Sequence, residues 1–81
     1  MELRHLRYLV AVAEQGSFSG AARRLHVAQS AISEQLSNLE SEISVPLFAR
    51  SSKNATLTKE GLLFLDEARR VLSAADHAVH V

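Results

Sequence analysis

The stretch Ser17–Ser41, SFSGAARRLHVAQSAISEQLSNLES, predicts two short amphipathic helices joined by a tight turn. Ser17 is a favourable N-cap, and the apolar residues that follow it lie at helical spacing as far as Leu25. The turn falls at residues 25–27, where His26 is a residue type that tolerates positive φ. A second helix runs from about Gln29 to Ser41, with apolar residues at spacings of four, three and four: Ile32, Leu36, Leu39 and Ile43. The pattern predicts a helix-turn-helix.

The other side of this second helix is small and polar. It carries Ser30, Ser33, Glu34 and Ser37, and Gln29 stands at its start. Short side chains would let such a helix enter a DNA major groove, where Gln pairs bidentately with adenine and Ser contacts several bases or a phosphate. The periodicity alone leaves a second interpretation open, in which a plain three-helix core carries serines for solubility.

The flanking segments complete a recognisable architecture. Residues 3 to 15 predict an amphipathic helix that ends at Gly16, and residues 45–58 predict a short β-hairpin in which Pro46 permits only an edge strand. The loop of this hairpin is basic, with Arg50 and Lys53, which is typical of a wing that touches the DNA backbone or minor groove. An ordinary surface hairpin is the alternative. The expected fold class is mainly α: a winged helix-turn-helix, with a three-helix core and a short β-hairpin wing, followed by a long linker and dimerisation helix.

The last helix is expected from Lys59 to the end, capped by Thr58, so the chain divides into a DNA-binding domain, 1–58, and a linker helix, 59–81. This helix carries two apolar lines. We assign Phe64 and Val71 to packing against the first helix of the same chain. The other line alternates spacings of four and three, which is typical of a helix–helix seam, and we assign it with Gly61 to the same helix of a second chain. The predicted dimer interface is Leu65, Ala68, Leu72, Ala75 and Val79.

The amino-acid composition excludes several kinds of functional site. The chain has 81 residues and no cysteine, which excludes disulfides, thiol catalysis and cysteine-based zinc sites. No apolar run reaches the length of a membrane span, so we expect a cytoplasmic protein without a membrane partner. No spacing suggests a catalytic triad, and His77 and His80 lack a carboxylate partner at usable spacing. We therefore expect no enzyme activity, cofactor or metal.

The chain resembles the N-terminal region of LysR-type transcriptional regulators over nearly its whole length. The resemblance is carried by the order and spacing of short motifs: Leu3-Arg4-His5-Leu6 with Tyr8, Gly16-Ser17-Phe18-Ser19, Ala21-Ala22, Leu25-His26-Val27, Gln29, Ile32-Ser33, Leu39-Glu40, Leu47-Phe48-Ala49-Arg50, Leu57-Thr58 and Gly61. It implies a promoter-binding domain that works as a dimer, or as a tetramer in a full-length protein. It also implies a C-terminal domain of periplasmic-binding-protein type, absent from this chain, that binds a small-molecule effector.

The expected DNA contacts follow from the helix pattern and the resemblance together. They are Ser17, Arg23, Gln29, Ser30, Ser33, Glu34, Ser37, Arg50 and Lys53. Three positions depart from the family pattern: Ala28 replaces a common serine cap, Ser30 a usual proline and Glu34 a frequent arginine. Glu34 either accepts a hydrogen bond from cytosine or weakens phosphate binding.

Net charge favours a rival function. Nine basic and nine acidic residues give a formal charge of zero, whereas DNA-binding domains usually carry a positive face. The rival is a small helical protein-interaction module that dimerises through its last helix and presents the serine-rich side to a protein.

Overall fold

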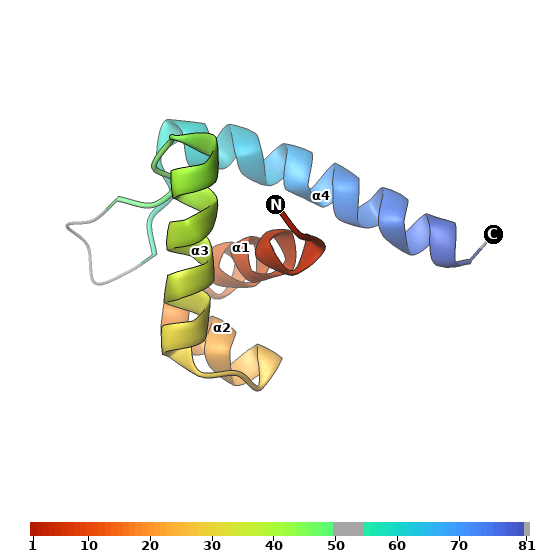
Figure 1. The fold of residues 1–81 in the computed structure, drawn as a ribbon. Coiled ribbons are helices and arrows are strands. Elements are labelled where there is room, and N and C mark those ends of the chain that lie inside the picture. Colours follow the sequence, from red (N-terminus) through yellow and green to blue (C-terminus); the bar gives the residue numbers. More distant parts are fainter. Residues whose placement is uncertain (50–54, 81) are drawn as a thin grey trace.

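Four helices make up most of the described chain, which in this computed structural model comprises residues 1–49 and 55–80. They are α1 (Leu3–Gln15), α2 (Phe18–Leu25), α3 (Gln29–Ile43) and α4 (Lys59–Val79). Figure 1 shows α3 crossing in front of α1, with α2 below and α4 running away from the core. The mainly α class and the position of each predicted helix are confirmed.

The ends of the helices follow from local chemistry. Gly16 ends α1 in the left-handed region at φ 72°, and the Ser17 hydroxyl oxygen accepts from the Gly20 N–H at 2.9 Å to begin α2. His26 ends α2 at φ 58°, which confirms the predicted turn. α3 ends at Ile43, two residues later than the predicted end at Ser41, and Ser44 caps it at φ 59°. Neither His26 nor Ser44 is glycine, and a backbone hydrogen bond closes each turn: the Val27 N–H donates to the Ala22 carbonyl at 3.1 Å and the Val45 N–H to the Glu40 carbonyl at 3.2 Å.

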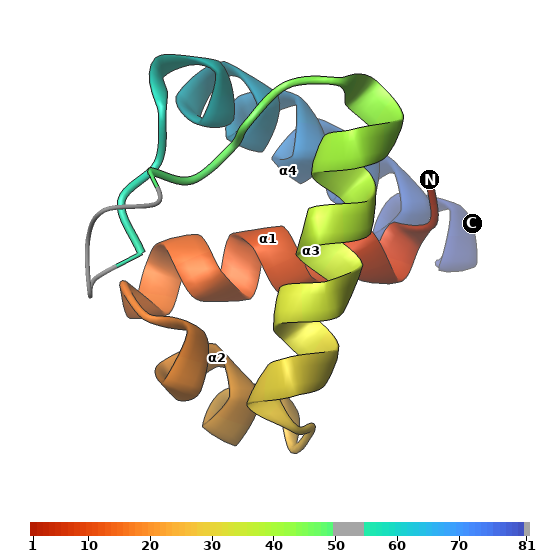
Figure 2. The same ribbon diagram turned by 60° about the vertical axis from the view of Figure 1, so that its left-hand side comes forward.

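The core forms where α1 meets the other three helices. α1 packs against α2, α3 and α4, and α2 also packs against α3 (Figure 2). The buried apolar residues are Leu6, Leu9, Ala11, Val12, Ala21, Ala22, Ile32, Leu36, Leu39, Leu47, Phe48, Leu65 and Ala68. The predicted α3 stripe is therefore the buried side of that helix, with Ile43 partly buried at its end.

The segment between α3 and α4 is less regular than predicted. Within the described residues it forms one isolated antiparallel bridge, between Phe48 and Leu57, and no strand. The Ala49 N–H donates to the Thr56 carbonyl at 2.8 Å, and the Thr58 N–H donates to the Leu47 carbonyl at 2.9 Å. These bonds pair the two arms at their base. The predicted loop residues Arg50 and Lys53 lie outside the described residues.

The two apolar lines of α4 divide differently from the prediction over the half of the helix that lies on the core. Leu65 and Ala68, assigned to a partner chain, are 9% and 2% exposed within this chain, and Leu72 is partly buried against the same core. Of the residues assigned to the first helix, Phe64 packs on the core but Val71 is 42% exposed. The interface role of Ala75 and Val79 stays a prediction. Gly61 begins the buried line, because a Cβ there would collide with the Leu47 carbonyl oxygen.

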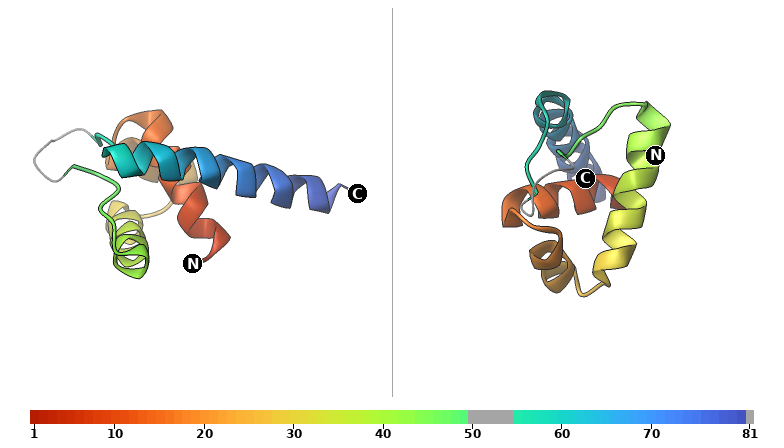
Figure 3. Two further views of the ribbon diagram at one scale, coloured as in Figure 1. Left: turned by 90° about the horizontal axis from the view of Figure 1, so that it is seen from above. Right: turned by 90° about the vertical axis from the view of Figure 1, so that its left-hand side faces the viewer.

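The far half of α4 leaves the core. The molecule measures 43 × 27 × 19 Å, and α4 extends well beyond the bundle when viewed from above (Figure 3). From residue 73 to residue 79 only Ala75 is partly buried, while Val79 is 80% exposed. In the described ranges, no helix combines the length and apolar character needed to cross a membrane.

Candidate DNA interface

The outward face of α3 is a continuous polar surface. It consists of the exposed residues Gln29, Ser30, Ser33, Glu34, Ser37, Asn38 and Ser41. The buried stripe of Ile32, Leu36 and Leu39 anchors the opposite side of the helix. The structure thus brings five of the predicted contact residues together on one exposed face, while their contacts with DNA stay predictions.

A buried carboxylate fixes the chain that leaves α3. Glu40 is only 8% exposed, and its Oε2 accepts from the N–H groups of Leu47 at 2.6 Å and Phe48 at 3.2 Å. Hydrogen bonds to a charged acceptor are stronger than neutral ones. They hold Leu47 and Phe48 against α3.

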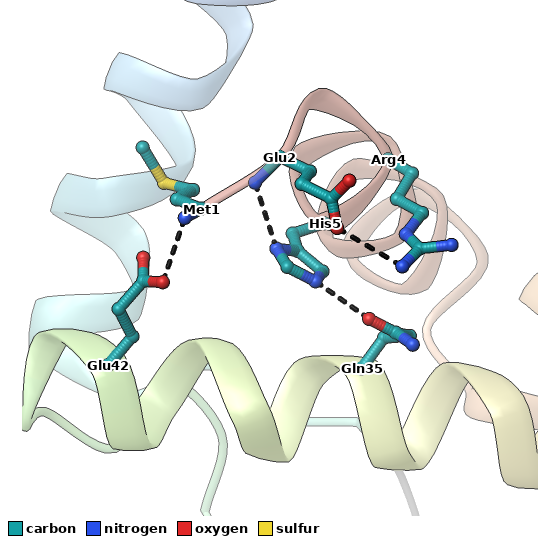
Figure 4. A network of polar contacts seen from close by, with 6 residues as sticks. All are labelled: Met1, Glu2, Arg4, His5, Gln35 and Glu42. Carbon is teal, nitrogen blue, oxygen red and sulfur yellow. Dashed lines mark hydrogen bonds and ion pairs between the residues drawn. The ribbon is translucent and has the colours of Figure 1, made fainter.

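His5 ties the first turn of α1 to the middle of α3 (Figure 4). The Glu2 N–H donates to Nδ1 of His5 at 3.0 Å, so this nitrogen carries no proton. Nε2 then carries the proton and donates to Oε1 of Gln35 at 2.7 Å. Sequence reasoning missed this bond, because His5 and Gln35 are far apart in sequence. His5 entered only as part of a family motif.

The flank beside α2 supplies a cation and a hydroxyl. Arg23 is exposed and makes no ion pair with any described residue, whereas Arg24 beside it pairs with Glu14 at 2.7 Å. Ser17 is partly exposed, and its oxygen accepts from Gly20 while its hydroxyl hydrogen stays available. Ser17 thus caps α2 and Arg23 lies within it, as expected from the sequence, while their contacts with DNA stay predictions.

A shallow cleft joins this flank to the segment after α3. It is lined by Phe18, Ser33, Leu36, Ser37, Glu40, Phe48 and Ala49. The rings of Phe18 and Phe48 lie 5.3 Å apart, which packs the start of α2 against the base of the 47–57 segment. Ala49 therefore lies on the same side as Ser33 and Ser37.

Sequence reasoning missed two exposed polar residues. Asn38 lies on the outward face of α3, one turn beyond Glu34, and carries an amide of the kind that pairs with adenine. Lys59 is exposed at the start of α4 and, among the described residues, has no acidic partner within ion-pair distance. The spacing of four from Glu34 could have identified Asn38, but only the fold shows which cations are left unpaired.

Nothing in the described part of the chain resembles a metal centre. No three His, Asp or Glu side chains gather there. His80 instead places Nδ1 2.7 Å from the carbonyl oxygen of Asp76 in its own helix.

Comparison with known proteins relates this surface to a bacterial regulator family. Residues 3–62 match the family described as bacterial regulatory helix-turn-helix proteins of the lysR family. The regulator ClcR of Pseudomonas putida is 46% identical over 76 residues, covering 94% of this chain and 26% of ClcR. BenM of Acinetobacter baylyi is 47% identical over 79 residues, covering 98% of this chain and 26% of BenM. The chain spans about a quarter of the length of these relatives.

Solved structures share the arrangement closely. The complex of BenM_DBD with benA site 1 DNA superposes with a TM-score of 0.95 at 46% identity, covering 99% of this chain and 93% of that one. The CbnR_DBD–DNA complex gives a TM-score of 0.94 at 44% identity, covering 99% of this chain and 92% of that one.

Proposed function

Because the chain belongs to the lysR family of bacterial regulatory helix-turn-helix proteins, we propose that it binds double-stranded promoter DNA for a transcription regulator. The observation that carries this proposal is the exposed outward face of α3, which is polar, built mostly of short side chains and anchored by a buried stripe. Such a helix fits a major groove. Two of the similar structures are complexes of DNA-binding domains with DNA.

The contacts divide by chemistry. Gln29, Ser30, Ser33, Glu34 and Ser37 face the base edges, and Ser17 and Arg23 on α2 meet the phosphate backbone. For Arg50 and Lys53, which lie outside the described residues, we propose contacts with phosphates or the minor groove. Phosphate contacts set register and affinity, whereas base contacts set specificity. The protein acts by binding, not by catalysis, as the named relatives are transcription regulators.

Residues 1–58 form the DNA-binding domain, and α4 links it to further domains. Because the relatives are about four times longer, a small-molecule effector would act through a C-terminal domain beyond this chain. We also propose that the linker helix makes a homodimer, within a dimer or tetramer of the full-length protein. Val71 and three residues of the predicted interface that are not fully buried, Leu72, Ala75 and Val79, form its outward line toward the second chain. A two-fold axis would present two α3 helices to half-sites about one DNA turn apart.

A salt titration of binding to mixed-sequence duplex DNA tests the proposal against the protein-interaction module. Each phosphate contact contributes a slope of about −0.9 in log K against log salt for duplex DNA. We expect a measurable slope that falls by roughly 1 unit in Arg23→Ala, with the exposed Arg4→Ala as the matched control. Arg4 pairs with Glu2 in the first turn of α1, at the opposite end of that helix from α2. Absence of binding at low salt would favour the rival module.

Sedimentation of the chain tests the dimer separately. Val71→Glu should shift the chain to monomer, because it places a charge in the outward line of α4. Leu62→Glu is the control, since Leu62 is 58% exposed but lies on the opposite flank of the helix. A wild-type chain that stays monomeric at high micromolar concentration would contradict this assignment.

A further inference from the structure

The outward face of α3 has an unusual charge distribution for a surface that meets DNA. Residues 25–49, which include the whole of α3, contain neither lysine nor arginine. Among the described residues, the outward face carries one carboxylate, Glu34. The helix therefore repels phosphate rather than attracting it, and the cations that bind the backbone must come from other elements.

Glu34 occupies the centre of this face. With 3.6 residues per turn, it lies directly opposite the buried stripe of Ile32, Leu36 and Leu39. Ser30, Ser37 and Ser41 lie one or two turns away on the same line, at spacings of four, three and four. Since all three neighbours are short serines, the Glu34 side chain projects furthest from the helix and would reach deepest into a groove.

No neighbouring cation neutralises this carboxylate within the described residues. The other exposed acids mostly have partners: Glu2 with Arg4, Glu14 with Arg24 and Arg69, Glu42 with the Met1 amino group, Asp66 and Glu67 with Arg70, and Asp76 with Arg7. Glu34 has no ion pair with any described residue. The Glu34 carboxylate is therefore available to interact with groups in the DNA groove.

We propose that Glu34 reads a cytosine in the operator through its exocyclic amino group, an inference that rests on the proposed DNA-binding function. In the major groove cytosine presents the N4 amino donor, which a carboxylate accepts. Guanine presents two acceptors and thymine an acceptor with a methyl group, so both repel Glu34. Adenine pairs its amino donor with the N7 acceptor, which suits an amide better than a carboxylate. Glu34 thus selects for cytosine and against the other three bases.

Binding-site selection from random duplexes, with wild type and Glu34→Gln, tests this inference. The wild type should select one cytosine in each half-site, and its replacement by thymine should weaken binding about 5- to 100-fold. Glu34→Gln should select adenine at that position and leave all others unchanged, because an amide can pair with adenine N6 and N7. Equal thermal unfolding of the two proteins would verify that this exposed substitution leaves the fold intact.

Glu42→Gln is the matched control, since it removes the same charge from the last turn of α3, where Glu42 contacts the Met1 amino group at 2.8 Å. It should select the wild-type sequence. If Glu34→Gln raises affinity for all duplexes by one factor and selects the wild-type sequence, Glu34 only repels phosphate and the inference is overturned alone. If the wild type selects no sequence and binds no duplex at low salt, the proposed function is overturned together with it.

Discussion

Helices α3 and α4 were both identified from apolar residues at spacings of three and four, yet the structure agrees in full with only one of the two predictions. α3 has a single apolar stripe, and that stripe is buried. α4 has two apolar lines, and part of the line expected to meet a second chain, Leu65 and Ala68, is buried within this chain. Periodicity therefore orients a helix when its other side is polar. It does not choose between two apolar sides.

The two helices also differ in what they leave exposed. α3 leaves a face of short polar side chains with one carboxylate, while α4 leaves leucine and valine in water, with Leu63 66% exposed. A polar face that fits DNA needs no cover in the free protein, whereas an exposed apolar line on a protruding helix favours association. The exposed surface of α3 therefore suits DNA binding, whereas that of α4 suits association between chains.

The largest expected effect concerns the buried line of α4. Leu65→Ala should lower the free energy of unfolding by about 2–4 kcal/mol, because it opens a cavity against α1. Val71→Ala should change it by about 0.5 kcal/mol or less, since Val71 is largely exposed. Urea unfolding at several protein concentrations measures both and separates dimerisation from folding. A larger loss in Val71→Ala would restore the original assignment of the two lines.

The second largest effect on stability is expected where the start of α4 packs against Leu47. Gly61→Ala should cost about 1–3 kcal/mol, because the new methyl group would collide with the Leu47 carbonyl. Gly16→Asn serves as the control, since asparagine tolerates the left-handed region and space around Gly16 is open. Thermal unfolding distinguishes the two. Equal stability of Gly61→Ala and wild type would show that α4 can shift away from Leu47 at little cost.

For Gln29 on α3 we expect weaker DNA binding with no change in the free energy of unfolding. Gln29→Ala should weaken binding to the selected operator by about 1–3 kcal/mol if its adenine contact is bidentate, and should relax specificity at that base. Fluorescence anisotropy with single-base operator variants measures this, while the exposed position leaves unfolding unchanged. Uniform weakening on every duplex would assign Gln29 to the backbone instead of the bases.

The smallest effect is electrostatic and connects three helices. The hydrogen bond from Arg24 lowers the pKa of Glu14 below its usual value of 4.5, and the charge of Arg69 on α4 adds to this. A lowered carboxyl pKa contributes stability that is present above the unfolded value and is lost as the pH falls through the folded value. At pH 7 Glu14→Gln should therefore cost about 0.2–1 kcal/mol, as usual for exposed pairs.

Thermal unfolding of Glu14→Gln and wild type should converge below pH 4.5 and in about 1 M salt, where exposed charges are screened. A difference that persists at both extremes would mean that Glu14 acts through packing and not through charge.

Local sequence patterns were enough to predict the helices, the turn and the outward face of α3. These features depend on local chemistry: Ser17 caps α2, His26 accepts a left-handed turn, and the polar and apolar sides of α3 differ sharply. The motif order also indicated the family to which the chain belongs.

Three features became visible only in the folded chain: which residues of α4 face the core, the bond between His5 and Gln35, and the bonds from Glu40 to the chain after α3. It also reduced the predicted hairpin to a single bridge within the described residues. Each of these depends on contacts between segments distant in sequence or on space available for a close approach. The Cβ that Gly61 lacks makes room for the Leu47 carbonyl, and no local pattern in α4 specifies that neighbour.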